Sequence, residues 1–181
     1  MFKRLLALGA VSVAVVWMIA WLGVAFGVGS PLFAFLANWV AMSWMAVAGQ
    51  FVHFSLPRFW SEHREWEGDG RNYELVGIRA FKALVRRGPL TVLSPTLRMP
   101  REVSVASLHA LEAEMHKAEA GHVIALIIGL ALAAWLLLLG LPAATAWLLL
   151  FNLLLNGYPI MLQRYNRIKL RQRIARLAAG A

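Results

Sequence analysis

The chain has 181 residues, 60% of them hydrophobic, and a mean hydropathy of +0.64, which argues against a soluble globular domain. It contains no cysteine, so disulfides, thiolate metal sites and a cysteine nucleophile are excluded. The net charge of +9 would suggest nucleic-acid binding in a soluble protein, but its distribution points to a membrane surface, and we expect no nucleic-acid partner.

Four apolar blocks are each long enough to cross a hydrocarbon core of ~30 Å at ~1.5 Å per residue. The first block exceeds the apolar core of a signal peptide, so we expect it to be retained. Gly140-Leu141-Pro142 separates the last two, because proline cannot continue the preceding helix. The sequence therefore predicts an all-α integral membrane protein with four transmembrane helices at about 5–28, 31–56, 121–141 and 143–165.

The second block, 31–56, carries polar side chains that include Asn38 and Gln50. It could span the bilayer fully, or it could be a helix that lies partly in the interface. Its length and the charge distribution favour a full span.

The positions of Lys and Arg predict the topology. Two precede the first apolar block, ten lie between the second and third, and six, from Arg164 to Arg176, follow the fourth, whereas the two short connections carry none. Under the positive-inside rule, both termini and the central segment 57–120 lie on the cytoplasmic side. We expect a single multi-pass membrane domain, 1–181, in a bacterial-type cytoplasmic (inner) membrane.

The central segment, 57–120, holds all nine acidic residues and is too charged to enter lipid. We expect it to pack on the membrane as short helices and a loop. From Ser104, apolar residues that include Leu108, Leu111 and Met115 recur at three- and four-residue steps, which predicts a helix running into the third span. The tail 166–181 is basic and amphipathic, as in helices that contact anionic headgroups.

Glu119 and His122 stand three residues apart at the entry to the third span, so they are neighbours on a helix. A carboxylate beside an imidazole can hold one tautomer, which is what a general base for a hydroxyl group requires. The alternative is an interfacial histidine that is hydrogen-bonded to a neighbouring helix. The apolar hairpin should bring this pair near 163–167.

The fourth predicted helix carries a polar stripe. Its members fall within roughly 80° of one another around an ideal helix: Asn152, Asn156, Pro159, Gln163 and Asn166. Polar groups at such depth face protein, ligand or water, and helix–helix hydrogen bonds are the simpler explanation.

His109, Glu112, His116, Glu119 and His122 also have spacings found among metal ligands, and Glu-x-x-His occurs in carboxylate di-iron bundles. Such bundles need a matching motif on other helices, and only two further histidines, His53 and His63, remain in the chain. We therefore expect no metal, with the first three residues forming a polar face with local ion pairs.

Three blocks of the chain resemble the glycosyl-diaponeurosporenoate acyltransferase family, whose namesake completes a carotenoid glycoside. The blocks are Trp66-Glu67-x-x-Gly70-x-x-Tyr73 with Gly77-Ile78-Arg79-x-Phe81-Lys82, then Lys117-Ala118-Glu119-x-x-His122, and finally Asn156 and Pro159 with Gln163-Arg164-Tyr165-Asn166-Arg167. Phe81 stands where the family more often has Trp.

The resemblance implies transfer of a fatty acyl group, from a thioester donor, to a hydroxyl of a lipid-linked sugar such as a carotenoid glycoside or other glycolipid. It makes membrane lipids, that acceptor and that donor the expected partners, with no cofactor besides the thioester. His122 would be the base and Glu119 its orienting partner. The expected substrate-binding residues are Asn156, Gln163, Arg164, Tyr165, Asn166, Arg167, Arg79 and Lys82.

Two other functions stay open at this point. Small four-helix membrane proteins include non-catalytic assembly or scaffold proteins, and the His/Glu cluster would suit a metal-dependent membrane oxidase.

Overall fold

The computed structural model describes residues 2–52, 54, 56–57, 60, 62, 64–87 and 102–179, and the regular structure in this part of the chain is helical throughout. Four helical segments are long and apolar enough to cross a membrane, which confirms the predicted fold class. They are Phe2–Phe26, Pro31–Ala48, Val105–Leu138 and Pro142–Ala179.

The chain forms two compact units. We call residues 1–54 with 121–157 the membrane unit, and residues 55–120 with 158–181 the polar unit. The unit boundaries at 120/121 and 157/158 fall within continuous helical structure, so two helical segments of the chain contribute residues to both units.

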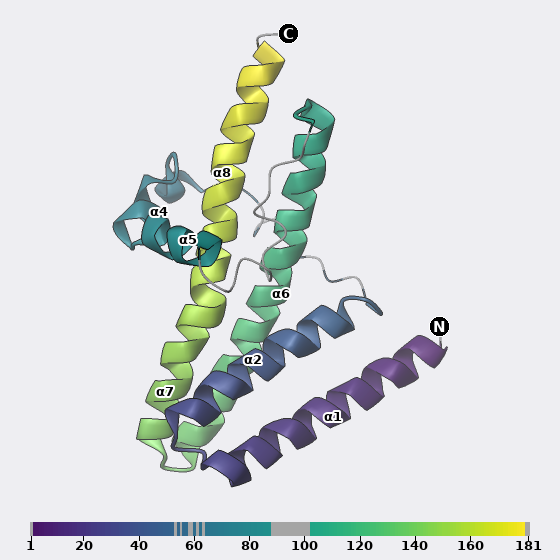
Figure 1. The fold of residues 1–181 in the computed structure, drawn as a ribbon, viewed down its shortest axis with the longest axis vertical. Coiled ribbons are helices and arrows are strands. Elements are labelled where there is room, and N and C mark those ends of the chain that lie inside the picture. Colours follow the sequence, from purple (N-terminus) through teal and green to yellow (C-terminus); the bar gives the residue numbers. More distant parts are fainter. Residues whose placement is uncertain are drawn as a thin grey trace. The chain divides into compact units, whose positions relative to one another are not determined.

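The membrane unit begins with α1 (Phe2–Phe26) and α2 (Pro31–Ala48), which lie side by side as an antiparallel hairpin in Figure 1. Ser30 caps α2, since its hydroxyl accepts a hydrogen bond from the Phe33 amide at 3.1 Å, and Pro31 occupies the first turn. The α2 helix ends at Ala48 rather than near residue 56. There Gly49, a poor helix former, begins a turn in which its amide bonds the Met45 carbonyl.

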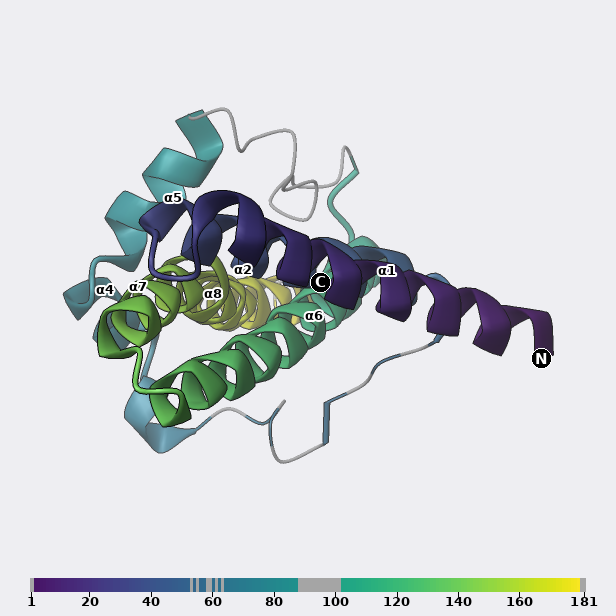
Figure 2. The same cartoon turned by 90° about the horizontal axis from the view of Figure 1, so that it is seen from below.

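The membrane unit continues with the second part of α6 (Val105–Leu138) and with α7 (Pro142–Asn152). Figure 2 shows the short turn between them. Gly140 adopts φ +73°, its amide bonds the Leu137 carbonyl and the Leu141 amide bonds the Leu136 carbonyl, which is a Schellman motif. The expected break at this turn is therefore confirmed, and Pro142 starts the next helix.

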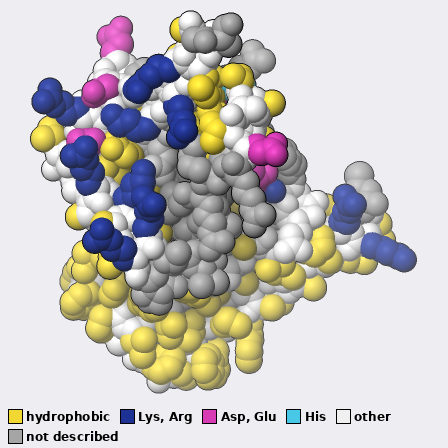
Figure 3. Space-filling model, turned by 45° about the horizontal axis from the view of Figure 1, so that its top comes forward, with side chains coloured by type: hydrophobic (Ala, Val, Ile, Leu, Met, Phe, Trp, Pro, Cys, Tyr) yellow, Lys and Arg dark blue, Asp and Glu magenta, His cyan; other side chains and the backbone are white. Residues whose placement is uncertain are grey.

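The core of the membrane unit draws on α1, α2, α6 and α7. Half of its buried members are alanines, which let helix backbones approach closely, as in other membrane helix bundles. The buried members are Leu22, Phe33, Ala34, Ala37, Ala133, Leu136, Ala144 and Leu148. Leu22 is the only buried residue of α1, and hydrophobic side chains cover much of the exposed surface of this unit in Figure 3, as suits contact with lipid.

The polar unit contains a 3₁₀ turn (Glu65–Glu67), α4 (Arg71–Leu75), α5 (Ile78–Arg87), the first part of α6, and α8 (Tyr158–Ala179). The basic tail is the continuation of α8 rather than a separate helix. Lys and Arg side chains gather on the face of this unit that Figure 3 presents.

The start of α6 agrees with the sequence. The Ser107 amide donates to the Ser104 hydroxyl at 3.1 Å, and the Ser104 amide donates to the Ser107 hydroxyl at 3.0 Å, so each caps the other. Leu108 and Met115 are buried against Leu170 of α8, which confirms the predicted apolar stripe.

A π-helical turn, Leu153–Gly157, joins α7 to α8. Pro159 lacks the amide that an α-helix would use at this level, and a wider turn is one way in which a helix absorbs that loss. The predicted polar stripe was projected on an ideal α-helix, so its angular spacing does not hold across this turn.

Candidate functional site

A buried arginine stands at the centre of the polar unit. Arg164 of α8 is 8% exposed, and its Nε donates to Glu67 Oε1 at 2.6 Å and to the Tyr73 hydroxyl at 3.2 Å. Tyr73 also donates its hydroxyl hydrogen to Glu67 at 2.5 Å. The three side chains form a closed hydrogen-bonded triangle, which ties the Glu65–Glu67 turn and α4 to α8.

Burial and hydrogen bonding act in opposite directions on Glu67. Burial alone raises the pKa of this carboxyl, but hydrogen bonds from Arg164, Tyr73 and the Arg64 amide outweigh it and lower the pKa to about 2. Burial and the Glu67 carboxylate together raise the pKa of Tyr73. At neutral pH the carboxylate is therefore charged and the phenol is protonated.

The rest of the Arg164 guanidinium is also occupied. Its Nη1 donates to the Trp60 carbonyl at 2.6 Å and to Glu119 Oε1 at 3.3 Å, and its Nη2 donates to the Glu62 carbonyl at 3.3 Å. The Trp60 indole donates to the same Glu119 oxygen at 2.8 Å. With all of these donors engaged, Arg164 acts as a structural tie among α6, α8 and the segment between residues 60 and 67.

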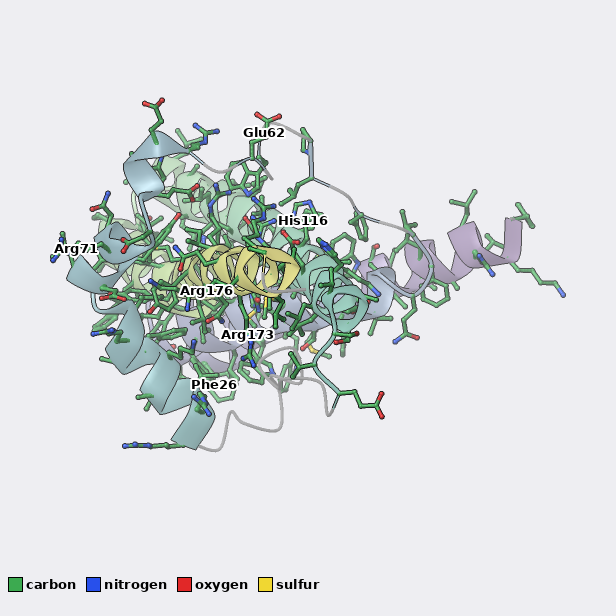
Figure 4. The ribbon with its side chains drawn as sticks, turned by 90° about the horizontal axis from the view of Figure 1, so that it is seen from above. Phe26, Glu62, Arg71, His116, Arg173 and Arg176 are labelled. Carbon is green, nitrogen blue, oxygen red and sulfur yellow. The ribbon has the colours of Figure 1, made fainter. Side chains whose placement is uncertain are left out.

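Glu119 has a second arginine partner. Arg167 Nη2 lies 2.8 Å from Glu119 Oε2, a charge contact without hydrogen-bond alignment, and Arg167 Nη1 lies 2.8 Å from His116 Nδ1. Glu119 is fully buried and Arg167 is 5% exposed. His116, which we expected on an exposed polar face, therefore contacts a buried arginine. Figure 4 labels His116 of α6 and Arg173 and Arg176 of α8.

A second polar group lies between α5 and α8. Lys82 Nζ donates to Asn166 Oδ1 at 2.6 Å, and its ammonium lies 5.3 Å from the centre of the Tyr165 ring. The Lys169 ammonium lies 5.6 Å from the same ring. Asn166 is 7% exposed, and its Nδ2 has no hydrogen-bond acceptor among the described residues.

The surroundings of Lys82 are positively charged. Burial, and after it the charges of Arg86 and Lys169, lower the pKa of Lys82. A cluster of cations next to an amide donor is suited to an anionic group such as a phosphate.

Tyr165 is held at its other end by Glu74, which accepts from its hydroxyl at 2.9 Å and also lies 3.3 Å from Arg79 Nε. Gly70, at φ +95°, packs against the Tyr165 ring, and a β-carbon there would lie 3.0 Å from Tyr165 Cδ2. A side chain at residue 70 would therefore strain the backbone and would require the ring to shift by a few tenths of an ångström.

The membrane unit contains a separate polar chain. His122 Nδ1 lies 3.3 Å from Asn156 Oδ1, Asn156 Nδ2 donates to Asn152 Oδ1 at 2.8 Å, and Asn152 Nδ2 donates to the Leu126 carbonyl at 2.9 Å. Asn152 and Asn156 are buried, and His122 is partly exposed. These hydrogen bonds link the end of α7 and the π-helical turn that follows it to α6.

The predicted site residues fall into these groups. Glu119 meets Arg164 and Arg167, Lys82 meets Tyr165 and Asn166, and His122 meets Asn156. Arg79 reaches the second group through Glu74, and Gln163 is buried on α8. His122 contacts Asn156, whereas Glu119 contacts the two arginines, Trp60 and His116.

Sequence reasoning missed Trp60, Glu67, Tyr73 and Glu74 as partners within these groups, whereas the helix–helix hydrogen bonds considered for the polar stripe are found at Asn152. Glu67 and Tyr73 belonged to a motif quoted for its resemblance, and that motif is the signal that could have found them. Trp60 gave no such signal, because its hydrogen bond to Glu119 joins residues that are 59 positions apart.

Within the described residues, no three His, Asp or Glu side chains come together as a metal site. His109 Nδ1 lies 3.6 Å from Glu112, which agrees with the expected local pairing, and Glu112 is also bonded at 2.5 Å by Arg171, which lies on α8. His53 and His63 lie outside the described residues.

Four helices able to span a membrane, together with a unit whose buried polar side chains include the ion pairs of Arg164 and Arg167, define a helical membrane protein with a folded polar part. A model of the glycosyl-4,4'-diaponeurosporenoate acyltransferase family matches residues 57–176. The match covers well over half of the chain, so the protein belongs to this family, a family of acyltransferases. Neither curated proteins nor solved structures give a match.

Proposed function

We propose that this protein transfers a fatty acyl group from a thioester donor to a hydroxyl of a glycosylated membrane lipid, a carotenoid glycoside or other glycolipid. The family supports acyl transfer, and the substrate in the family's description is a glycosyl carotenoid acid. The observation that carries the mechanism is the contact of 3.3 Å between His122 Nδ1 and Asn156 Oδ1, inside the matched region. It leaves the other ring nitrogen to act as a base.

In the proposed reaction, His122 Nε2 removes the proton of the acceptor hydroxyl as its oxygen attacks the thioester carbonyl. The tetrahedral intermediate then collapses, the carbon–sulfur bond breaks, and the thiolate takes up the proton from the imidazolium. The products are an ester and a free thiol, and His122 returns to its neutral form.

The role of Glu119 changes from the one expected. Its carboxylate is bonded by Arg164 Nη1 and Trp60 and lies against Arg167. We therefore assign it to neutralising the two arginines, and we assign the orientation of His122 to Asn156. Asn156 in turn uses its amide donor on Asn152, so it is not a free oxyanion donor.

Lys82 and Asn166 are the proposed binding residues for the anionic part of the donor. Two cations near Lys82 and the unused Nδ2 of Asn166 favour a phosphate group, which carriers of acyl thioesters contain. The ring of Tyr165 lies near both Lys82 and Lys169, with each ammonium less than 6 Å from its centre, and so helps to position these cations.

We place the protein in the cytoplasmic membrane, with both termini and the polar unit on the cytoplasmic side. The support is the distribution of Lys and Arg, since the short connections Gly27–Ser30 and Gly140–Leu141 carry no charge. An acyl thioester made in the cytoplasm and a lipid acceptor would then both reach the enzyme without crossing the bilayer.

The test uses full-length protein in lipid nanodiscs with a labelled acyl thioester and a glycosylated carotenoid acid. We expect His122→Ala to lose activity by roughly 10²- to 10⁴-fold, as for removal of a general base. His109→Ala, an exposed histidine on the same helix, serves as the control and should retain activity. Equal product from His122→Ala and wild type would contradict the proposed mechanism. Glu119→Gln should lose activity together with thermal stability.

A further inference from the structure

The chain of hydrogen bonds from His122 to the Leu126 carbonyl, within the membrane unit, has a defined direction. At its far end is the Leu126 carbonyl, which can only accept hydrogen bonds. Asn152 must therefore turn its NH₂ group towards Leu126, as it does at 2.9 Å. This leaves Asn152 Oδ1 as the acceptor for its next neighbour.

The same reasoning sets each following link. Asn156 donates its NH₂ group to Asn152 Oδ1 at 2.8 Å, so its own Oδ1 faces His122. An amide oxygen cannot donate, and the ring nitrogen 3.3 Å away must therefore carry the hydrogen. The hydrogen lies on Nδ1, and Nε2 keeps its lone pair.

The position of Asn152 is constrained sterically as well. A β-carbon on Gly129 of α6 would lie 2.5 Å from Asn152 Nδ2 and 2.7 Å from its Oδ1. Glycine at this position lets α6 and α7 approach until the amide can reach the Leu126 carbonyl. Asn152 is 1% exposed and Asn156 is fully buried, so water does not compete for these bonds.

We infer that Asn152 is a positioning residue, which acts through Asn156 to hold His122 in the Nδ1–H tautomer with Nε2 available as the base. This inference rests on the proposed function only in one respect, the role of Nε2 as the general base. The tautomer itself is a property of the resting protein and can be measured without substrate.

The test is ¹⁵N NMR of histidine-labelled full-length protein in nanodiscs at about pH 8, where histidine is neutral. His122→Gln identifies the His122 signals by their loss. We expect wild type to carry the hydrogen on Nδ1, the reverse of the preference of free histidine in water. A hydrogen on Nε2 in wild type would overturn the inference.

Three variants separate positioning from packing. Asn152→Leu fills a similar volume but frees the Asn156 amide to rotate, so we expect the Nε2–H tautomer to appear. Asn152→Asp keeps an acceptor for the Asn156 NH₂ group and should retain the wild-type tautomer. Asn38→Leu, which removes another buried amide of the same unit that bonds the Leu148 carbonyl, should leave the tautomer unchanged. Equal tautomer ratios in all three variants would overturn the inference.

Kinetics complete the test. We expect Asn152→Leu to lower kcat by roughly 10- to 1,000-fold, within the loss that a wrong tautomer causes, with KM little changed. If wild type shows the Nδ1–H tautomer but His122→Gln remains fully active, the inference on the tautomer holds and the proposed function fails.

Discussion

Arg164 and Glu67 form an ion pair of 2.6 Å between residues that are 97 positions apart, and their side chains are only 9% and 2% exposed. A buried pair of this kind is costly to break from one side, because the partner keeps its charge without compensation. It ties α8 to the 3₁₀ turn, and the bond from the same Arg164 Nε to Tyr73 ties α8 to α4.

The first prediction concerns this pair. Arg164→Met should destabilise the protein by roughly 3–5 kcal/mol, because the Glu67 and Glu119 carboxylates lose their shared cation. Thermal unfolding in detergent, followed by tryptophan fluorescence, measures the effect. The exposed Arg173→Met in the same helix is the control, and an equal shift in both variants would contradict the assigned role.

The second prediction is the pH dependence of stability that follows from Glu67. Its pKa is about 2 in the folded protein and near 4.5 ordinarily, so the folded state favours the charged form. Its contribution, about 3 kcal/mol, is complete above pH 4.5 and is lost as the pH falls towards 2. When unfolding is measured from pH 4.5 down to pH 2, the free energy of unfolding should fall less in Glu67→Gln than in wild type. Parallel curves would refute the prediction.

The third prediction compares two glycines of α6. Gly129→Ala should reduce thermal stability and activity, because its β-carbon would enter the Asn152 amide. At Gly121 no atom lies within 4 Å of the added carbon, so Gly121→Ala should be neutral or stabilise the helix by up to ~1 kcal/mol. Comparable effects of the two variants on the melting temperature would show that Gly129 and Asn152 do not pack closely against each other.

The fourth prediction concerns donor binding. Lys82→Gln should raise KM for the acyl thioester by roughly 10-fold or more while kcat stays close to wild type, since the reacting groups are unchanged. The effect should shrink at high salt, where charge attraction to the donor is screened. Arg87→Gln on the exposed end of α5 provides the control. A fall in kcat with unchanged KM would assign Lys82 to another role.

The fifth prediction tests the orientation in the membrane. The chain has no cysteine, so single cysteines can be introduced without removing others. Gly29→Cys, in the first connection, should react with a membrane-impermeant maleimide added to intact cells, whereas Leu75→Cys, which is 82% exposed on α4, should react only after lysis. The reverse pattern would invert the proposed topology.

Local sequence signals accounted for most of the helices. The proline and glycine at the turn after α6, the reciprocal serines at its start, and the length of the apolar blocks act within a few residues, so they can be recognised without coordinates. The end of α2 was less accessible, because apolar residues continue past Gly49 and hide the break.

The sequence alone determined that the protein is a helical membrane protein. It also predicted Glu119, His122, Asn156 and the polar end of the last helix as site residues. Only the tertiary structure decided which of these side chains are partners. Glu119 and His122 are close in sequence, but hydrogen bonds and burial direct Glu119 to Arg164 and Arg167, and His122 to Asn156. Such choices depend on groups that are 34 to 48 positions away, where no helical periodicity reaches.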